Sequence, residues 1–180
     1  MNNTTLFLLG DSITAGFPSK KHLPNINILN YAVSGDSTVE CLDRISAEWF
    51  SIQPDAVFLC IGTNDFARER TDENILENIQ AIVTKIGRYV EIQKIHITSI
   101  FPTRENILRP NERIQHFNVQ LEQLSKKIGC CYFHLHKYFI DSNGMLKKEF
   151  TDDGLHLTES AYILWSNVLS EYITKNILKS

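Results

Sequence analysis

The sequence of 180 residues lacks long hydrophobic runs and clusters of basic residues. The apolar stretch nearest its start, Leu6 to Leu9, is too short for a signal-peptide core or a membrane span and follows no basic residue. A net charge of -3, with acidic and basic residues interspersed, offers no basic surface for nucleic acid or an anionic membrane. These absences predict a soluble, cytoplasmic protein with no membrane span and no nucleic-acid partner.

Cysteines are few, and their spacing does not match the usual metal or redox motifs. The four residues, Cys41, Cys60, Cys130 and Cys131, form no CxxC pair. Cys60 and Cys131 lie inside apolar runs, where a thiol usually behaves as a small buried hydrophobic group. We therefore expect these cysteines to be reduced and structural, with no metal-binding or redox role.

Short apolar runs alternate with amphipathic patterns along the chain. The runs at 5–9, 26–32, 56–61, 95–101 and 130–134 predict five strands of a parallel sheet that is covered on both faces. Apolar residues spaced three or four apart predict helices between them, the last over about residues 159–178. Because no linker, repeat or low-complexity segment interrupts this alternation, we expect a single domain over residues 1–180, an α/β/α sandwich whose ligands bind at the carboxyl ends of the strands.

The tripeptide Gly-Asp-Ser occurs twice, each time directly after a predicted strand, and its two serines have different sequence neighbours. Ser37 precedes Glu40 by three residues and is followed by a helical apolar pattern, which is the signature of a capping box. Ser12 has Ala15 at the equivalent place, and Gly16 soon interrupts any helix. We therefore expect Ser37 to cap a helix and Ser12 to be the candidate nucleophile.

A serine nucleophile needs partners, and two other predicted turns could supply them. Asp153 precedes His156 by three residues, so one loop could provide a general base and the carboxylate that orients it. The oxyanion of an acyl intermediate needs hydrogen-bond donors, which the backbone N–H groups of Ser12 and Gly35 and the amide of Asn64 could offer. All of these residues fall at predicted strand ends or in the loop before the last helix.

These residues together resemble the four sequence blocks of the SGNH hydrolases, also called the GDSL esterase and lipase family. The matching segments are Gly10-Asp11-Ser12, Gly35, Gly62-Thr63-Asn64-Asp65 and Asp153-Gly154-Leu155-His156. They stand in the family's order, so the resemblance spans nearly the whole chain. One departure is Ile13, where the family's GDSL motif has leucine.

The resemblance implies a flavodoxin-like five-stranded parallel sheet of order 2-1-3-4-5. It also implies Ser12 as nucleophile, His156 as base and Asp153 orienting the base, with an oxyanion hole from Ser12, Gly35 and Asn64. No cofactor and no metal are implied. The expected substrate is a small-molecule acyl ester or thioester, while acyl length, leaving group and oligomeric state are left open.

Phe66 and Phe101 follow the motif strands and are candidates for substrate contact, although ordinary loop packing would explain them too. Two other functions remain open at this stage. A metal-dependent phosphoesterase could use the acidic, Asn and His side chains at the same sheet edge, namely Asp11, Asn64, Asp65, Asp152, Asp153 and His156. A non-catalytic module that binds acyl groups or carbohydrate could keep the same fold.

Overall fold

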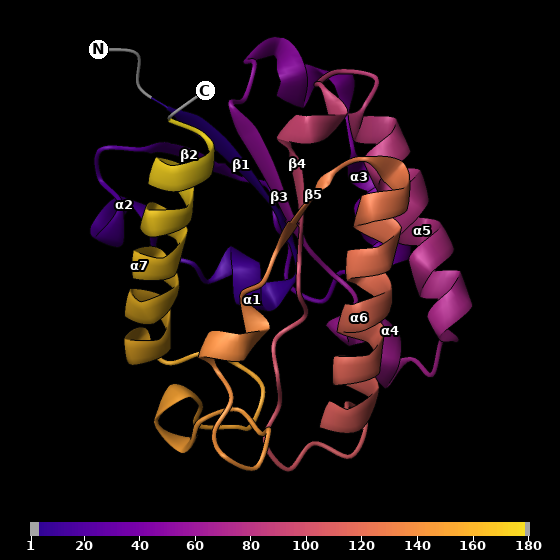
Figure 1. The fold of residues 1–180 in the computed structure, drawn as a ribbon, viewed down its shortest axis with the longest axis vertical. Coiled ribbons are helices and arrows are strands. Elements are labelled where there is room, and N and C mark those ends of the chain that lie inside the picture. The colour runs from indigo at the N-terminus through magenta and orange to yellow at the C-terminus, as the bar shows by residue number, and fades with distance from the viewer. Residues whose placement is uncertain (1–3, 179–180) are drawn as a thin grey trace.

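A parallel sheet of five strands forms the centre of the molecule (Figure 1). The structure, a computed structural model, describes residues 4–178. The strands are β1 (Thr5–Gly10), β2 (Asn27–Asn30), β3 (Ala56–Cys60), β4 (Ile95–Thr98) and β5 (Cys131–Phe133). Their order is β2-β1-β3-β4-β5 and every neighbouring pair is parallel, which confirms the predicted α/β class and strand order.

The helices cover both faces of this sheet (Figure 1). On one face lie α3 (Thr38–Arg44), α5 (Asp72–Ile86) and α6 (Asn111–Ile128), and α7 (Glu159–Asn176) lies on the other. The short helices α1 (Ser12–Ala15) and α4 (Thr63–Ala67) follow β1 and β3, and α2 (Ser19–His22) precedes β2. Among residues 4–178, four 3₁₀ turns complete the connections: η1 (Ala47–Ser51), η2 (Ile92–Lys94), η3 (His136–Tyr138) and η4 (Lys148–Phe150).

Alternation along the strands divides the core into two layers. In β1, Phe7 and Leu9 pack with α3, α5 and α6, whereas Leu6 and Leu8 pack with α7. Successive side chains of a strand point to opposite faces, so a run that is apolar at every position must be covered on both sides. The continuous apolar runs of the sequence are therefore explained by burial on both faces.

Strand β4 ends earlier than its apolar run predicts. Its run continues to Phe101, but the strand ends at Thr98. The backbone N–H of Ile100 donates to Asn118 Oδ1 at 2.8 Å, and Asn118 Nδ2 donates to the Ile100 carbonyl at 3.0 Å. Because this buried carboxamide of α6 satisfies both backbone groups, the chain can leave the sheet there without unpaired polar atoms.

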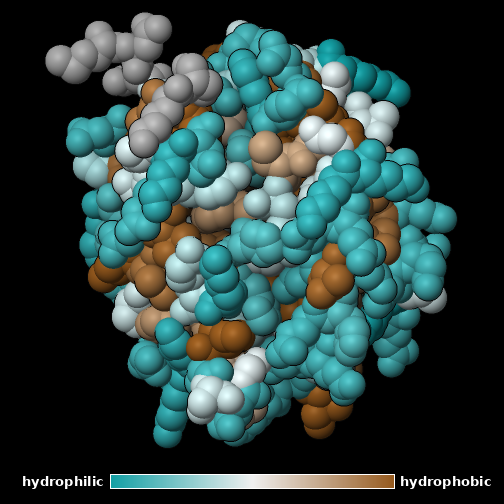
Figure 2. All heavy atoms as spheres, in the orientation of Figure 1, coloured by the Kyte–Doolittle hydropathy of each residue, from teal (hydrophilic) through white to brown (hydrophobic). Residues whose placement is uncertain are grey.

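Most of the face formed by α6 and α7 is hydrophilic, and its hydrophobic atoms lie in small separate groups (Figure 2). Within residues 4–178, no helix combines the length and the hydropathy needed to cross a bilayer.

Candidate active site

The first Gly-Asp-Ser turn places Ser12 at the carboxyl end of β1, as the first residue of α1. The helix cap is the preceding residue, because Asp11 Oδ1 accepts a hydrogen bond from the Ile13 N–H at 3.0 Å. The Ser12 hydroxyl is therefore not needed as a cap. Sequence reasoning missed this role of Asp11, although aspartate directly before a short helix is itself a capping signal.

The loop before α7 brings a histidine to Ser12. Ser12 Oγ lies 3.0 Å from His156 Nε2, and His156 Nδ1 lies 2.6 Å from Asp153 Oδ2. The other carboxylate oxygen of Asp153 accepts hydrogen bonds from the backbone N–H groups of His156 at 2.7 Å and Leu155 at 2.9 Å. The carboxylate thus fixes both the loop backbone and the imidazole ring.

This loop depends on a glycine between the aspartate and the histidine. Gly154 has a positive φ of 83°, and a Cβ at this position would lie 2.2 Å from the Arg104 carbonyl oxygen. The Arg104 N–H in turn donates to the Gly154 carbonyl at 2.8 Å. A larger residue would therefore push the loop of Asp153 and His156 away from the loop that follows β4.

The side chains of Asp153 and His156 are open to solvent. The side chains of Asp153 and His156 are 55% and 52% exposed, so substrate can approach from bulk water. Partial burial opposes ionisation of Asp153, but hydrogen bonds from the His156 ring and from two backbone N–H groups lower its pKa well below the usual value. An ionised carboxylate therefore faces the imidazole at neutral pH.

Gly35 and Asn64, the other expected oxyanion-hole residues, are connected through the second Gly-Asp-Ser turn. Gly35 has a positive φ of 88°, which favours glycine, and its N–H donates to no protein group among residues 4–178. Asn64 is the second residue of α4, and its Nδ2 donates to the Asp36 carbonyl at 2.8 Å. The turn therefore supplies a backbone acceptor that holds the Asn64 side chain.

Ser37 caps α3, as the sequence predicts. Its Oγ accepts from the Val39 N–H at 3.4 Å, and its own N–H donates to Glu40 Oε2 at 2.9 Å, which completes the capping box. The residue is fully buried, and Arg70 also donates to its hydroxyl. Ser37 is thus enclosed in a structural network rather than presented to substrate.

Asp11 is a buried acid close to the candidate nucleophile. Only 3% of the residue is exposed, and burial raises the pKa of Asp11 to about 7, even though the Ile13 N–H and the charge of Arg109 pull it down. This carboxyl group therefore titrates near neutral pH, within one residue of Ser12.

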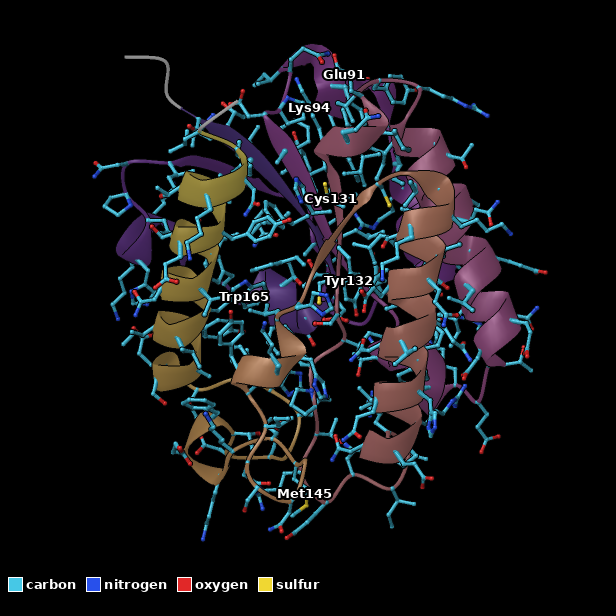
Figure 3. All side chains as sticks on the ribbon, in the orientation of Figure 1. Glu91, Lys94, Cys131, Tyr132, Met145 and Trp165 are labelled. Atoms are coloured by element: carbon cyan, nitrogen blue, oxygen red, sulfur yellow. The ribbon has the colours of Figure 1, made fainter. Side chains whose placement is uncertain are left out.

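The two aromatic residues expected to touch substrate lie in the core instead. Phe66 is 1% exposed and packs edge-on against Phe117, with ring centroids 5.3 Å apart. Phe101 is 2% exposed and packs against Trp165, which projects from α7 toward the sheet, as Figure 3 shows. Neither ring has free surface for a ligand, so the expectation of substrate contact at Phe66 and Phe101 is corrected to core packing.

The fold and this arrangement define a class of protein, an α/β hydrolytic enzyme with its serine at a strand end. The model of the GDSL-like lipase/acylhydrolase family matches residues 8–164, and the chain belongs to that family. The matched region, residues 8–164, is accordingly that of a serine hydrolase that acts on ester bonds.

Similar proteins agree with this assignment of fold. A solved Streptococcus pneumonia protein, described as a platelet activating factor, is 29% identical with a TM-score of 0.89, over 95% of this chain and 84% of that one. A lipase/acylhydrolase from Enterococcus faecalis is 23% identical with a TM-score of 0.79, over 96% of both chains.

One curated relative is longer than this chain. The N-acylneuraminate cytidylyltransferase of Escherichia coli O18:K1:H7 (strain RS218 / NMEC) is 26% identical over 168 residues. The match covers 92% of this chain and 39% of the relative. The chain therefore spans about two fifths of the length of that protein.

Proposed function

We propose that this enzyme cleaves carboxylic esters or thioesters through an acyl-enzyme on Ser12. His156 Nε2 accepts the Ser12 proton while Oγ attacks the acyl carbonyl carbon, and a tetrahedral oxyanion forms. Collapse of this intermediate breaks the bond to the alcohol or thiol, which takes the proton from His156. Water, deprotonated by the same nitrogen, then attacks the acyl-enzyme and releases the acid.

The observation that carries this proposal is the continuous path from Ser12 through His156 to Asp153, with contacts of 3.0 and 2.6 Å. With Asp153 ionised, Nδ1 must be the donor of this pair, which in the neutral ring leaves Nε2 to accept from the Ser12 hydroxyl. The carboxylate also stabilises the imidazolium that forms during attack.

For the oxyanion we assign three donors, namely the N–H groups of Ser12 and Gly35 and one N–H of Asn64 Nδ2. Asn64 uses its other Nδ2 hydrogen for the Asp36 carbonyl, which leaves one without an acceptor among residues 4–178. Donors that are already fixed before reaction stabilise developing charge without reorganisation, which makes such groups effective in catalysis.

The openness of the site favours a small acyl group whose alcohol part extends into solvent. His156 and Asp153 are each about half exposed, so this side of the site is open to water and is not an enclosed tunnel for a long chain. We therefore expect p-nitrophenyl acetate to be hydrolysed faster than the octanoate.

Intact-protein mass spectrometry after treatment with a fluorophosphonate tests the nucleophile. We expect one adduct, on Ser12, which is absent in Ser12→Ala and retained in Ser37→Ala, together with ester turnover that a chelator leaves unchanged. An adduct on another residue would contradict the assignment of Ser12. Chelator-sensitive activity on phosphate esters, without any adduct, would instead establish the metal-dependent phosphoesterase.

A further inference from the structure

Arg109, in the loop between β4 and α6, contacts the turn that carries Asn64. Its Nη2 donates to Asn64 Oδ1 at 3.1 Å, and its Nε donates to the Thr63 carbonyl at 3.0 Å. The side chain is half-buried, and burial lowers the pKa of Arg109 while the nearby Asp11 raises it. One guanidinium group thus holds both the backbone and the side chain of this turn.

These contacts determine which way the Asn64 carboxamide points. A guanidinium has no acceptor, so the Asn64 atom that faces Arg109 must be the oxygen. A carbonyl has no donor, so the atom that faces the Asp36 oxygen must be the nitrogen. Two independent neighbours therefore exclude the flipped amide, which would present an acceptor where the oxyanion needs a donor.

The positive charge has a second effect on the same group. A cation that donates to a carboxamide oxygen polarises the amide and makes its N–H groups stronger donors, because hydrogen bonds in a chain reinforce one another. The free N–H of Asn64 Nδ2 is the hydrogen that benefits. Arg109 can therefore strengthen the stabilisation of an oxyanion without contacting it.

The loop that carries Arg109 is itself fixed at both ends. Thr103 Oγ1 donates to the Arg109 carbonyl at 2.7 Å, and Asn111 Oδ1 accepts from the Thr103 N–H at 2.9 Å. At the start of the loop, the Arg104 N–H also donates to the Gly154 carbonyl in the loop of Asp153 and His156. The Thr103–Arg109 loop therefore connects the acid–base side of the site with the Asn64 side.

We propose that Arg109 is a positioning residue of the oxyanion hole, which sets the orientation and donor strength of the Asn64 amide. This inference rests on the proposed function, since it assumes that Asn64 contacts the oxyanion. It requires that the effect of Arg109 on catalysis disappear when Asn64 is absent.

A double-mutant cycle measured by kcat and KM on p-nitrophenyl acetate tests this requirement. Arg109→Ala is expected to lower kcat by about tenfold, the size of coupling found between contacting side chains of one network, with little change in KM. Asn64→Ala should lower kcat by about 10²- to 10³-fold. The double variant should match Asn64→Ala alone, because Arg109 then has no amide to position.

Arg113→Ala is the matched control. Arg113 is also half-buried, donates through Nε to Asp72 at 2.9 Å, and makes no hydrogen bond to Ser12, Gly35 or Asn64. It should lower stability while leaving kcat unchanged. Arg109→Lys keeps the charge but replaces the two nitrogens that contact Thr63 and Asn64 with a single ammonium, so an intermediate kcat is expected. The cycle can be run with lysine if the alanine variant does not fold.

Three results would overturn the proposal: losses in kcat that multiply in the double variant, a loss confined to KM, or no loss in Arg109→Ala and Arg109→Lys. The first two would make Arg109 a direct substrate contact. Failure of the proposed function itself would be visible earlier, in a wild-type protein that forms no Ser12 adduct and hydrolyses no ester.

Discussion

The two Gly-Asp-Ser turns contain the same residues, but the helix that follows begins at a different one of them. In the first turn Asp11 is the cap and Ser12 is the first helical residue. In the second turn Ser37 is the cap, and Asp36 pairs with Arg44, whose Nε donates to it at 2.8 Å. The helix cap falls one residue later in the second turn than in the first. The Ser37 hydroxyl therefore accepts from the helix backbone, whereas the Ser12 hydroxyl is not needed as a cap.

The contrast extends to the electrostatics of the two aspartates. Both are buried, at 3% and 6% exposure, but Asp36 has a guanidinium partner and Asp11 has no salt bridge among residues 4–178. The unpaired acid lies next to the hydroxyl that meets His156. The turn that carries the candidate nucleophile is therefore the one whose aspartate lacks a salt bridge, as is common at functional sites.

Replacing each serine with alanine should give the largest contrast between the turns. Ser12→Ala should lower kcat by about 10⁶-fold, the loss expected when the nucleophile of a hydrolytic triad is removed. Ser37→Ala should keep a kcat close to that of the wild type, because its hydroxyl faces Glu40 and Arg70 inside the protein. Initial rates on p-nitrophenyl acetate measure both, and an inactive Ser37→Ala beside an active Ser12→Ala would reverse the assignment.

The proposed oxyanion hole gives the second turn a part in catalysis through its backbone, which Asn64→Ala should reveal. Loss of the side chain that Asp36 and Arg109 hold should lower kcat by about 10²- to 10³-fold, as for other oxyanion-hole donors. Saturation kinetics separate kcat from KM. A change confined to KM would mean that Asn64 binds the substrate in its ground state and is not an oxyanion donor.

Much of this comparison could be predicted from local sequence, because its signals are short-range. The Ser37 capping box is confirmed by the structure, and so is the strand order, which the family resemblance implied. Ser12, Asp153 and His156 are brought together as their motifs indicate, and their catalytic roles remain predictions. The capping box and each of the motifs depend on residues that lie close together in the sequence.

Contacts between distant segments that carry no recognisable motif could not be predicted in this way. Arg109 reaches Asn64 across 45 positions, and no spacing rule connects a polar loop with a turn so far away. Phe66 and Phe101 illustrate the same limit, since an aromatic residue after a strand can face either solvent or core. The packing of Phe117 and Trp165 from separate helices decides the outcome.

The burial of Asp11 predicts a pH dependence of stability. Folded Asp11 keeps its proton up to about pH 7, because its pKa rises from the usual 3.8 to about 7. The unfolded chain binds fewer protons in this window, so the unfolding free energy falls as pH increases from about 4 to 7. A rise in the pKa from 3.8 to about 7 can lower the unfolding free energy by at most about 4 kcal/mol.

Asp11→Asn tests this dependence, since the amide oxygen can still accept from the Ile13 N–H. Relative to the wild type, the variant should gain stability as pH rises through the window and stay constant above it. Urea unfolding of both proteins at about pH 4.5 and about pH 8 gives the difference, in which other titrating groups cancel. Equal differences at the two pH values would show that Asp11 does not titrate in this range.

The smallest expected effect is on the free energy of unfolding, to which Ser37 should contribute more than Ser12. Ser37→Ala should lower the unfolding free energy by about 0.5 to 2 kcal/mol as a lost cap, near the upper end because Ser37 is fully buried. Thr71→Ala, which removes the exposed cap of α5, should fall near the lower end. Ser12→Ala should cost no stability, since Asp11 caps α1 and alanine is the better helix former. Thermal and urea unfolding of the three variants would therefore rank the serines opposite to their catalytic order, and a stability loss in Ser12→Ala equal to that in Ser37→Ala would show that both hydroxyls support the fold.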